Sequence, residues 1–276
     1  MKISLNDTKL VVCDIDGTLT RTGTVAPSAY TIETIEKLHE KGIAFGLASG
    51  RDAGQLRHLA REWGLSFDFE IVIGLNGSEY YDLYHDELNV LYTLKKEDVK
   101  QIIEKMLAKF PDLNVSIYRD GYRVLRFEDE MAVMSKKRNK VENYIVNDIS
   151  EMWAQDSAKV MFRVSEEVMK QIEPYAIEIS NERYRSCKTQ TTMLEFIHRD
   201  SDKGNSLKAY CLKNGIDLKD VVAFGDMSND NELLIAAGTG VCMKNGSDDC
   251  KASADIICDY TNDEDGVARF IEEYIL

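Results

Sequence analysis

Residues 11–23, VVCDIDGTLTRTG, place two aspartates one residue apart, directly after an apolar run. Asp14 and Asp16 are so close in sequence that each raises the free energy of ionising the other. The apolar residues from Lys9 to Cys13 predict a short buried strand, so both carboxyl groups should lie just beyond a strand end. Two carboxylates at one strand end therefore need a partner that offsets their charge.

Two flanking parts of the chain alternate apolar strands with amphipathic helices. This alternation is the sequence form of a parallel sheet whose strands are joined by crossover helices. The predicted strands cover residues 9–13, 43–49, 69–74, 221–225, 240–243 and 255–258, and the predicted helices cover residues 28–42, 52–63, 203–214 and 229–236, a short helix before residue 255 and a final helix from about Asp265.

The middle of the chain has a different pattern. A helix is predicted from Glu97 to Lys109, and the stretch NVSIYRDGYRVLRF predicts a hairpin that turns at Asp120-Gly121. The predicted fold class is therefore α/β, a Rossmann-like parallel-sheet core interrupted by an inserted α+β domain. Residues 1–83 and 198–276 are expected to form the discontinuous core domain, and residues 84–197 the inserted domain.

Composition excludes several classes of function. The 276 residues carry 48 acidic and 34 basic side chains, a formal net charge of −14, which argues against binding nucleic acid or an anionic membrane. The six cysteines form no CxxC pair and only four histidines are present, so free thiols in a reducing compartment are expected rather than a zinc site. No signal peptide or membrane-spanning run is evident, and we expect a cytoplasmic protein that is a monomer or a weak homo-oligomer.

Four polar clusters follow predicted core strands or begin a core helix. They are Asp14–Thr18, Ser49–Arg51, Lys203–Gly204 and residues 225–230, GDMSND. Alone, each cluster is equally typical of a solvated turn, a helix cap or an acidic helix start. Because α/β proteins bind ligands at the carboxyl edge of the parallel sheet, their common location favours a functional site.

Together these residues suit the chemistry of phosphoryl transfer. Asp14 and Asp226 offer the hard oxygen ligands that Mg²⁺ prefers, and the Lys203 ammonium would neutralise an incoming phosphoryl group. If Asp14 is the nucleophile, Asp16 can protonate the leaving oxygen and later deprotonate the attacking water. Neutral donors for the phosphoryl oxygens are expected from Ser49, the backbone amide of Gly50 and the backbone amide of Asn229.

The same residues carry a family resemblance. DIDGT at 14–18, SGR at 49–51, DKG at 202–204 and GDMSND at 225–230 resemble, in order and spacing, the four motifs of the haloacid dehalogenase superfamily of phosphatases. The long insertion, LNGSEYYD at 75–82 and DEDGVARFIEEYI at 263–275 resemble the Cof-type branch with a IIB cap domain. The resemblance covers essentially the whole chain.

This resemblance implies a role for each motif residue. Asp14 would be the nucleophile and Asp16 the acid/base. The Mg²⁺ ligands would be the side chains of Asp14 and Asp226 and the backbone carbonyl of Asp16. The phosphate would be held by Ser49, Gly50, Lys203 and Asn229, with Asp230 supporting the metal and Thr18 and Arg51 counted as supporting residues.

Two features depart from the family pattern. Lys244-Asn245-Gly246 stands where the family usually has Gly-Asn-Ala, which leaves the role of that loop open. Asp202 adds a negative charge beside Lys203, and the sequence does not determine which way this carboxylate points.

The leading functional hypothesis is a Mg²⁺-dependent phosphatase, a phosphoric monoester hydrolase acting on a small phosphorylated metabolite, with a sugar phosphate as the expected substrate class. Within enzymes the alternative is a phosphomutase, which returns the phosphoryl group to the sugar. Outside hydrolysis, the alternatives are a receiver-like module that stores a phosphoryl group and a metabolite sensor. The acid/base Asp16 and the large insertion speak against the storage module, which gains nothing from rapid hydrolysis.

Overall fold

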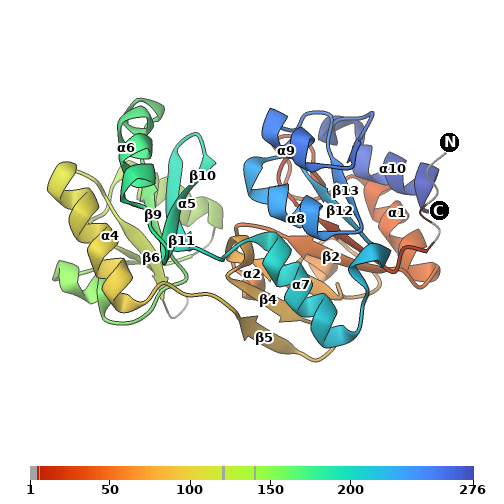
Figure 1. Ribbon diagram of the computed structural model, residues 1–276, viewed down its shortest axis with the longest axis horizontal. Coiled ribbons are helices and arrows are strands. Elements are labelled where there is room, and N and C mark those ends of the chain that lie inside the picture. The colour runs from red at the N-terminus through yellow and green to blue at the C-terminus, as the bar shows by residue number, and fades with distance from the viewer. Residues whose placement is uncertain (1–4, 6, 120–121, 140) are drawn as a thin grey trace. The chain divides into compact units, whose positions relative to one another are not determined.

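The computed structural model describes residues 5, 7–119, 122–139 and 141–276 (Figure 1). The chain divides into two compact units, Met1–Leu91 with Ser201–Leu276 as unit 1, and Tyr92–Asp200 as unit 2. Among the described residues, no helix has both the length and the apolar character needed to cross a membrane.

Unit 1 is built on one mixed sheet. Its strands are β1 (Leu10–Cys13), β2 (Ala44–Ala48), β3 (Ile71–Gly74), β4 (Glu79–Asp82), β5 (Glu87–Val90), β12 (Val221–Gly225), β13 (Thr239–Cys242) and β14 (Ile256–Ile257). Among the described residues the sheet has eight strands, in the order β14-β13-β12-β1-β2-β3-β4-β5. The six strands from β14 to β3 in this order pair in parallel, and β4 and β5 continue the sheet as antiparallel strands.

Helices cover both faces of this sheet. They are α1 (Ala29–Glu40), α2 (Ala53–Leu56), α3 (Leu59–Glu62), α7 (Lys203–Asn214), α8 (Asn231–Ala236), α9 (Asp248–Ser253) and α10 (Gly266–Tyr274), with 3₁₀ turns at η1 (Leu75–Gly77), η3 (Leu218–Asp220), η4 (Ser228–Asp230) and η5 (Asn262–Glu264).

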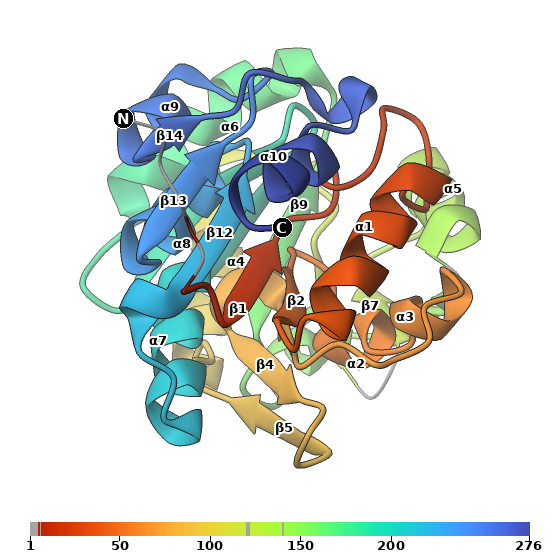
Figure 2. The same cartoon turned by 90° about the vertical axis from the view of Figure 1, so that its right-hand side faces the viewer.

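Alternation along β1 divides the core of unit 1 into two layers. Val11 and Cys13 pack in the layer formed with α1 and α10, whereas Leu10 and Val12 pack in the layer formed with α7 and α8. All four side chains are fully buried. Because both faces of β1 are covered, the strand is apolar at every position, which is typical of parallel sheets. Figure 2 shows β1 at the centre of unit 1, between β12 and β2.

Unit 2 is an α+β unit with its own core. Its strands are β6 (Ser116–Arg119), β7 (Tyr122–Leu125), β8 (Asn143–Ile145), β9 (Lys159–Arg163), β10 (Tyr184–Gln190) and β11 (Met193–His198), and its helices are α4 (Lys96–Lys109), α5 (Glu130–Asn139), α6 (Glu166–Ile179) and the 3₁₀ turn η2 (Ile149–Trp153). The strands form a sheet in the order β10-β11-β9-β6-β7-β8, antiparallel except between β7 and β8. Apolar residues of α4 and α6 pack on one face of it.

The predicted fold class is confirmed, with differences in detail. The edge strands β4 and β5, the helix α5 and the strand β8 were not predicted. The helix expected over residues 52–63 is two short helices, α2 and α3. The hairpin prediction holds for the pairing of β6 with β7, whereas its turn, Asp120-Gly121, lies outside the described residues.

The unit boundaries lie further along the chain than the sequence indicated. The core was expected to stop at residue 83 and resume at residue 198, whereas unit 1 runs to Leu91 and resumes at Ser201. The reason at the first boundary is β5, which pairs with β4 and so belongs to the core sheet. At the second boundary, the hydroxyl of Ser201 hydrogen-bonds the hydroxyl of Ser78 (2.9 Å), and Ser201 is the first buried residue of the returning chain.

Candidate active site

The site begins where two neighbouring strands end. β1 pairs in parallel with β12, and the backbone amide of Asp14 donates to the carbonyl oxygen of Phe224 (3.0 Å). Asp14 follows β1 and Asp226 follows β12, so two acidic residues distant in sequence lie side by side at one sheet edge. The chain continues from β1 to β2 on one side and returns through β12 on the other, which makes this edge a topological switch point.

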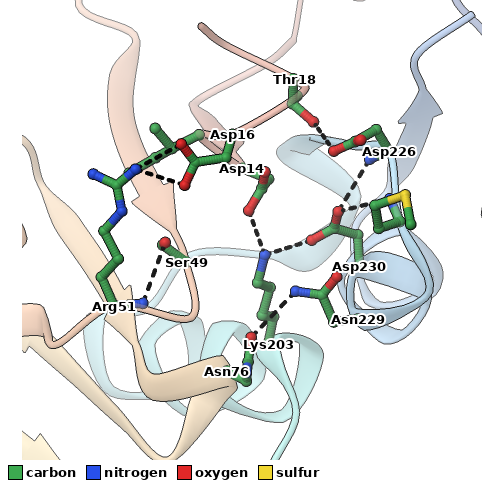
Figure 3. A network of polar contacts seen from close by, with 12 residues as sticks. Asp14, Asp16, Thr18, Ser49, Arg51, Asn76, Lys203, Asp226, Asn229 and Asp230 are labelled. Carbon is green, nitrogen blue, oxygen red and sulfur yellow. Dashed lines mark hydrogen bonds and ion pairs between the residues drawn. The ribbon is translucent and has the colours of Figure 1, made fainter. Parts of the chain in front are cut away.

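Lys203 is the centre of the charge network at this edge (Figure 3). It is fully buried, and its ammonium group donates to a carboxylate oxygen of Asp14 (2.6 Å) and to one of Asp230 (2.5 Å). Burial by itself lowers the pKa of Lys203, but the charges and hydrogen bonds of the two aspartates outweigh it and raise this pKa above its usual value. Lys203 therefore carries a full positive charge at neutral pH.

A close helix pairing places this lysine. Lys203 is the first residue of α7, and a Cβ atom at Gly204 would lie 2.1 Å from the carbonyl oxygen of Glu232 in α8. Only glycine permits this approach of α7 to α8. The carboxylate of Asp202 accepts from the backbone amide of Asn205 (2.6 Å), so it caps α7. This contact answers the open question of its direction.

Three carboxylates meet near the ammonium group. Oxygen atoms of Asp14, Asp226 and Asp230 lie within 4.8 Å of one another, and all three residues are buried. Burial raises the pKa of Asp14 well above its usual value although Lys203 opposes the shift, and burial together with the charge of Asp230 raises the pKa of Asp226 to about 6. Such a set of hard oxygen donors with excess negative charge fits a divalent cation such as Mg²⁺.

The segment after Asp14 is closely fitted to Asp226. The hydroxyl of Thr18 donates to a carboxylate oxygen of Asp226 (2.8 Å). Gly17 has a φ of +91°, and a Cβ atom there would lie 2.5 Å from the other carboxylate oxygen. Any other residue at position 17 would be strained in its backbone and would displace the carboxylate of Asp226. Glycine is therefore required at position 17 for two reasons: the positive φ of the turn, and the space that the Asp226 carboxylate occupies.

Asp16 and Asp14 have different environments. The carboxylate of Asp16 is exposed, and one nitrogen of the Arg51 guanidinium group donates to both of its oxygens (2.6 Å each). Figure 3 shows Asp16 bonded to Arg51 and Asp14 bonded to Lys203. The two aspartates thus avoid mutual repulsion because each has its own cation. Their separate partners suit them to separate chemical tasks.

The other predicted donors lie at the ends of β2 and β12. Ser49 is buried, and its hydroxyl oxygen accepts from the backbone amide of Arg51 (3.3 Å). A Cβ atom at Gly50 would lie 3.2 Å from the side-chain oxygen of Asn76, and the side chain of Asn229 donates to that same oxygen (3.2 Å). Ser49, Gly50 and Asn229 are thus gathered around one further residue, Asn76.

Asn76 was not among the predicted site residues. It lies in η1, directly after β3, with a φ of +54°, and it is 3% exposed. Its backbone amide donates to the carbonyl oxygen of Ser49 (3.1 Å). An Asn-Gly pair after an apolar strand, at the same edge as the other clusters, was the signal that could have identified it.

Asp230 joins the network from two sides. One of its carboxylate oxygens accepts from Lys203, and the other accepts from the backbone amides of Asp226 (3.0 Å) and Met227 (3.2 Å). It therefore supports both the lysine and the backbone that presents Asp226. Every predicted site residue lies in unit 1, and Asp14, Thr18, Lys203, Asp226 and Asp230 form one continuous network.

Comparison with known proteins shows the family to which this chain belongs. The family model of the haloacid dehalogenase-like hydrolases matches residues 11–271. This chain therefore belongs to the haloacid dehalogenase-like hydrolase family, as the motif resemblance predicted.

Several proteins similar to this chain over most of its length are named phosphatases. The 5-amino-6-(5-phospho-D-ribitylamino)uracil phosphatase YitU of Bacillus subtilis (strain 168) is 28% identical over 270 residues, 96% of this chain and 97% of that protein. The HMP-PP phosphatase of Escherichia coli (strain K12) is 25% identical over 252 residues, 88% of this chain and 87% of that protein. These matches confirm the predicted enzyme class, a haloacid dehalogenase-like phosphoric monoester hydrolase.

A solved structure supports the fold. The haloacid dehalogenase subclass IIB sugar phosphatase BT4131 is similar to this chain with a TM-score of 0.78 and 22% identity, over 96% of this chain and 98% of that one. The expectation of a subclass IIB architecture is confirmed at the level of the fold.

Proposed function

We propose that this protein is a Mg²⁺-dependent phosphatase that hydrolyses a small phosphorylated metabolite through an aspartyl-phosphate on Asp14. One observation carries the proposal: the Asp14 carboxylate is held by the buried Lys203 and lies beside Asp226 at the end of the neighbouring strand. This arrangement joins a nucleophile, a cation for the phosphoryl group and a set of metal-binding oxygens.

Asp14 performs the first step. A carboxylate oxygen of Asp14 forms a bond to phosphorus while the bond from phosphorus to the ester oxygen breaks. The Lys203 ammonium offsets the negative charge of the phosphoryl oxygens, and Ser49, the Gly50 amide and Asn229 donate to them. Asp14, Asp226 and the carbonyl oxygen of Asp16 would hold Mg²⁺, which would supply positive charge that offsets the repulsion between an anionic ester and an anionic nucleophile.

Asp16 transfers the protons. Its carboxyl group protonates the departing ester oxygen, and the resulting carboxylate then takes a proton from the water that attacks phosphorus and releases Asp14. In the structure, the guanidinium group of Arg51 engages both carboxylate oxygens of Asp16. The carboxyl group of Asp16 must therefore leave Arg51 before it can reach the departing ester oxygen.

A sugar phosphate is the substrate class that we propose. The named relatives act on a phosphorylated ribitylamino-uracil and on HMP-PP, and the subclass IIB structural neighbour is a sugar phosphatase. The substrates that these names give are small phosphorylated metabolites. We also propose a cytoplasmic location, for which the support is that all six cysteines are free thiols.

A phosphate-release screen tests the proposal. The protein is assayed with Mg²⁺ on hexose, pentose and polyol phosphates, nucleotides and p-nitrophenyl phosphate, and kcat/KM values are compared. We expect one or a few sugar phosphates to exceed the other esters. Interconversion of hexose 1- and 6-phosphates without phosphate release would instead indicate a phosphomutase.

Magnesium affinity is expected to depend on pH through Asp226. Because the pKa of this carboxyl group is about 6 in the metal-free protein, Mg²⁺ must displace a proton at lower pH. The apparent Kd for Mg²⁺ should rise as pH falls through about 6, and the raised pKa of Asp14 acts in the same direction. Isothermal titration calorimetry measures this dependence.

Thr18→Val is the matched variant for this titration. The Thr18 hydroxyl lowers the pKa of Asp226 by donating to its carboxylate, so its loss should move the rise in Kd to higher pH. A Kd that does not vary between about pH 5 and pH 7 would contradict the assignment of Asp226 as a ligand.

A further inference from the structure

The loop whose role the sequence left open contacts the catalytic segment directly. Asn245 lies between β13 and α9, and its side-chain amide nitrogen donates to the carbonyl oxygen of Gly17 (2.8 Å). Its side-chain oxygen accepts from the backbone amide of Asn262 (3.0 Å). Both ends of the Asn245 amide are thus engaged, which determines its orientation.

Asn262 makes a second bond to the same segment. It is the first residue of η5, it is 5% exposed, and its side-chain nitrogen donates to the carbonyl oxygen of Thr20 (2.9 Å). We call Asn245 and Asn262 the asparagine relay. Through the relay, two loops from the C-terminal part of the chain bind two backbone carbonyls in the segment that follows the nucleophile.

Of the two carbonyls that the relay binds, that of Gly17 is expected to matter more for catalysis. Gly17 lies between Asp16 and Thr18, and the peptide that follows a glycine rotates at low cost because no Cβ atom restricts it. The turn itself is held from within by the amides of Leu19 and Thr20, which both donate to the carbonyl oxygen of Ile15. Neither of these bonds involves the Gly17 carbonyl. The hydrogen bond from Asn245 therefore holds the carbonyl end of this peptide, in addition to the bond from the Thr18 hydroxyl to Asp226.

Both neighbours of Gly17 belong to the site. Rotation of the Gly17 peptide would move the hydroxyl of Thr18 relative to Asp226, to which it donates (2.8 Å). It would also shift the backbone of Asp16, whose carbonyl oxygen is a proposed Mg²⁺ ligand. Even a small shift of these atoms is sufficient to change rates, because catalysis requires reacting groups to be held within a fraction of an ångström.

We propose that the two residues of the asparagine relay are positioning residues for phosphoryl transfer. Asn245, supported by Asn262, holds the Gly17 peptide so that the oxygens of Asp16 and Asp226 stay in the positions that metal binding and catalysis require. This inference rests on the proposed function. Neither asparagine touches reacting atoms. An exposed hydrogen bond such as that of Asn245 adds little to the stability of the fold, so its effect should appear mainly in metal binding and in the rate of the chemical step.

Asn245→Asp and Asn245→Ala test the relay. Asn245→Asp keeps the acceptor for the Asn262 amide but removes the donor to Gly17, and Asn245→Ala removes both. With p-nitrophenyl phosphate and saturating Mg²⁺, we expect kcat to fall by about tenfold in each variant, the equivalent of one hydrogen bond, with KM nearly unchanged. The Mg²⁺ Kd measured by calorimetry should rise by a similar, roughly tenfold, factor.

Lys244→Ala is the control in the same loop. Its side chain is exposed, and the backbone bond from its amide to the carbonyl oxygen of Tyr260 does not depend on the side chain. We expect wild-type kcat and Mg²⁺ affinity from it. Asn262→Ala should change kcat and the Mg²⁺ Kd as Asn245→Ala does. Because Asn262 is buried, the melting temperature of the Asn262→Ala protein is measured as well. If that protein does not fold, the variants of the exposed Asn245 decide the result.

Two results would overturn the relay. The first is kcat and Mg²⁺ Kd values within about twofold of the wild type in both Asn245 variants, which would make the contact structural only. The second is an equal loss in Lys244→Ala, which would assign the effect to the loop as a whole. Failure of the proposed function is distinguishable, because the Mg²⁺ Kd is measured without turnover: the relay predicts its change even in a protein that releases no phosphate.

Discussion

Asp14→Asn is expected to lower Mg²⁺-dependent phosphate release by roughly 10⁴-fold or more, the scale on which enzymes respond to loss of their nucleophile. The amide cannot form the acyl-phosphate bond, although it has the same shape as the carboxyl group. Phosphate release from the best substrate of the screen, followed under single-turnover and steady-state conditions, measures the effect.

The same substitution should leave the fold intact. Burial raises the pKa of Asp14, so the folded protein disfavours its ionised form, and a neutral amide removes one of three crowded negative charges. Lys203 keeps its contact with Asp230. We expect a melting temperature equal to or above that of the wild type, together with loss of activity.

Asp259→Asn is the matched control. Asp259 is an exposed carboxylate of unit 1 that lies outside the charge network, and the substitution makes the same chemical change there. Activity should be unchanged. Substantial Mg²⁺-dependent turnover in Asp14→Asn would refute the aspartyl-phosphate mechanism.

Lys203→Met is the substitution with the second largest expected effect, and it should affect stability as well as rate. Lys203 is fully buried and paired with two carboxylates, so its loss leaves buried charges without their cation. Removing one partner of a buried ion pair typically costs about 3–5 kcal/mol. Urea unfolding at neutral pH measures this loss, and phosphate release should become undetectable.

The loss of stability is expected to depend on pH in a defined direction. Without Lys203, nothing opposes the effect of burial on Asp14, so its pKa in the folded variant rises further above the value in the unfolded chain. The folded variant then binds more protons than the unfolded chain, and its stability falls as pH rises through the interval between the two pKa values. The stability gap to the wild type should be wider at about pH 7 than at about pH 5.

Two comparisons make this result specific. Lys208→Met changes an exposed lysine of the same helix, α7, and should leave stability within about 0.5 kcal/mol of the wild type. The double variant Lys203→Met with Asp14→Asn removes one of the unpaired carboxylates and should recover part of the lost stability. A Lys203→Met protein as stable as the wild type at all pH values would contradict the central role of the lysine.

Local patterns were sufficient for most elements of the core. Residue order predicts several core elements directly: the strands β1, β2, β3 and β12 from their apolar runs, and the helix α1 from its amphipathic repeat. A strand buried on two faces is apolar throughout, and a helix buried on one face is apolar at helical spacing. The edge strand β5 leaves a weaker trace, since its side chains are mostly exposed, and the predicted core boundary was placed before it.

Candidate site residues could be named from their position after predicted strands. Asp14 and Asp226 were identified because strand ends in a parallel sheet meet at one edge, and Lys203 because it begins the first core helix after the insertion. The pairing of partners could not be read in the same way. That Lys203 bonds Asp14 and Asp230, while Arg51 bonds Asp16, depends on side-chain directions set by helix packing.

By itself the sequence determined the class of fold, the edge on which the site lies and the residue types that supply its chemistry, because these follow from periodicity and from the order of short motifs. Only the tertiary structure decided which carboxylate meets which cation, that Asn76 joins the site, and that Asn245 and Asn262 hold the Gly17 and Thr20 carbonyls. The physical reason is the distance along the chain between the residues that interact. Periodicity is a local property of the chain, whereas the bonds between Gly17 and Asn245 or between Asp14 and Lys203 join residues that only the folded sheet brings together.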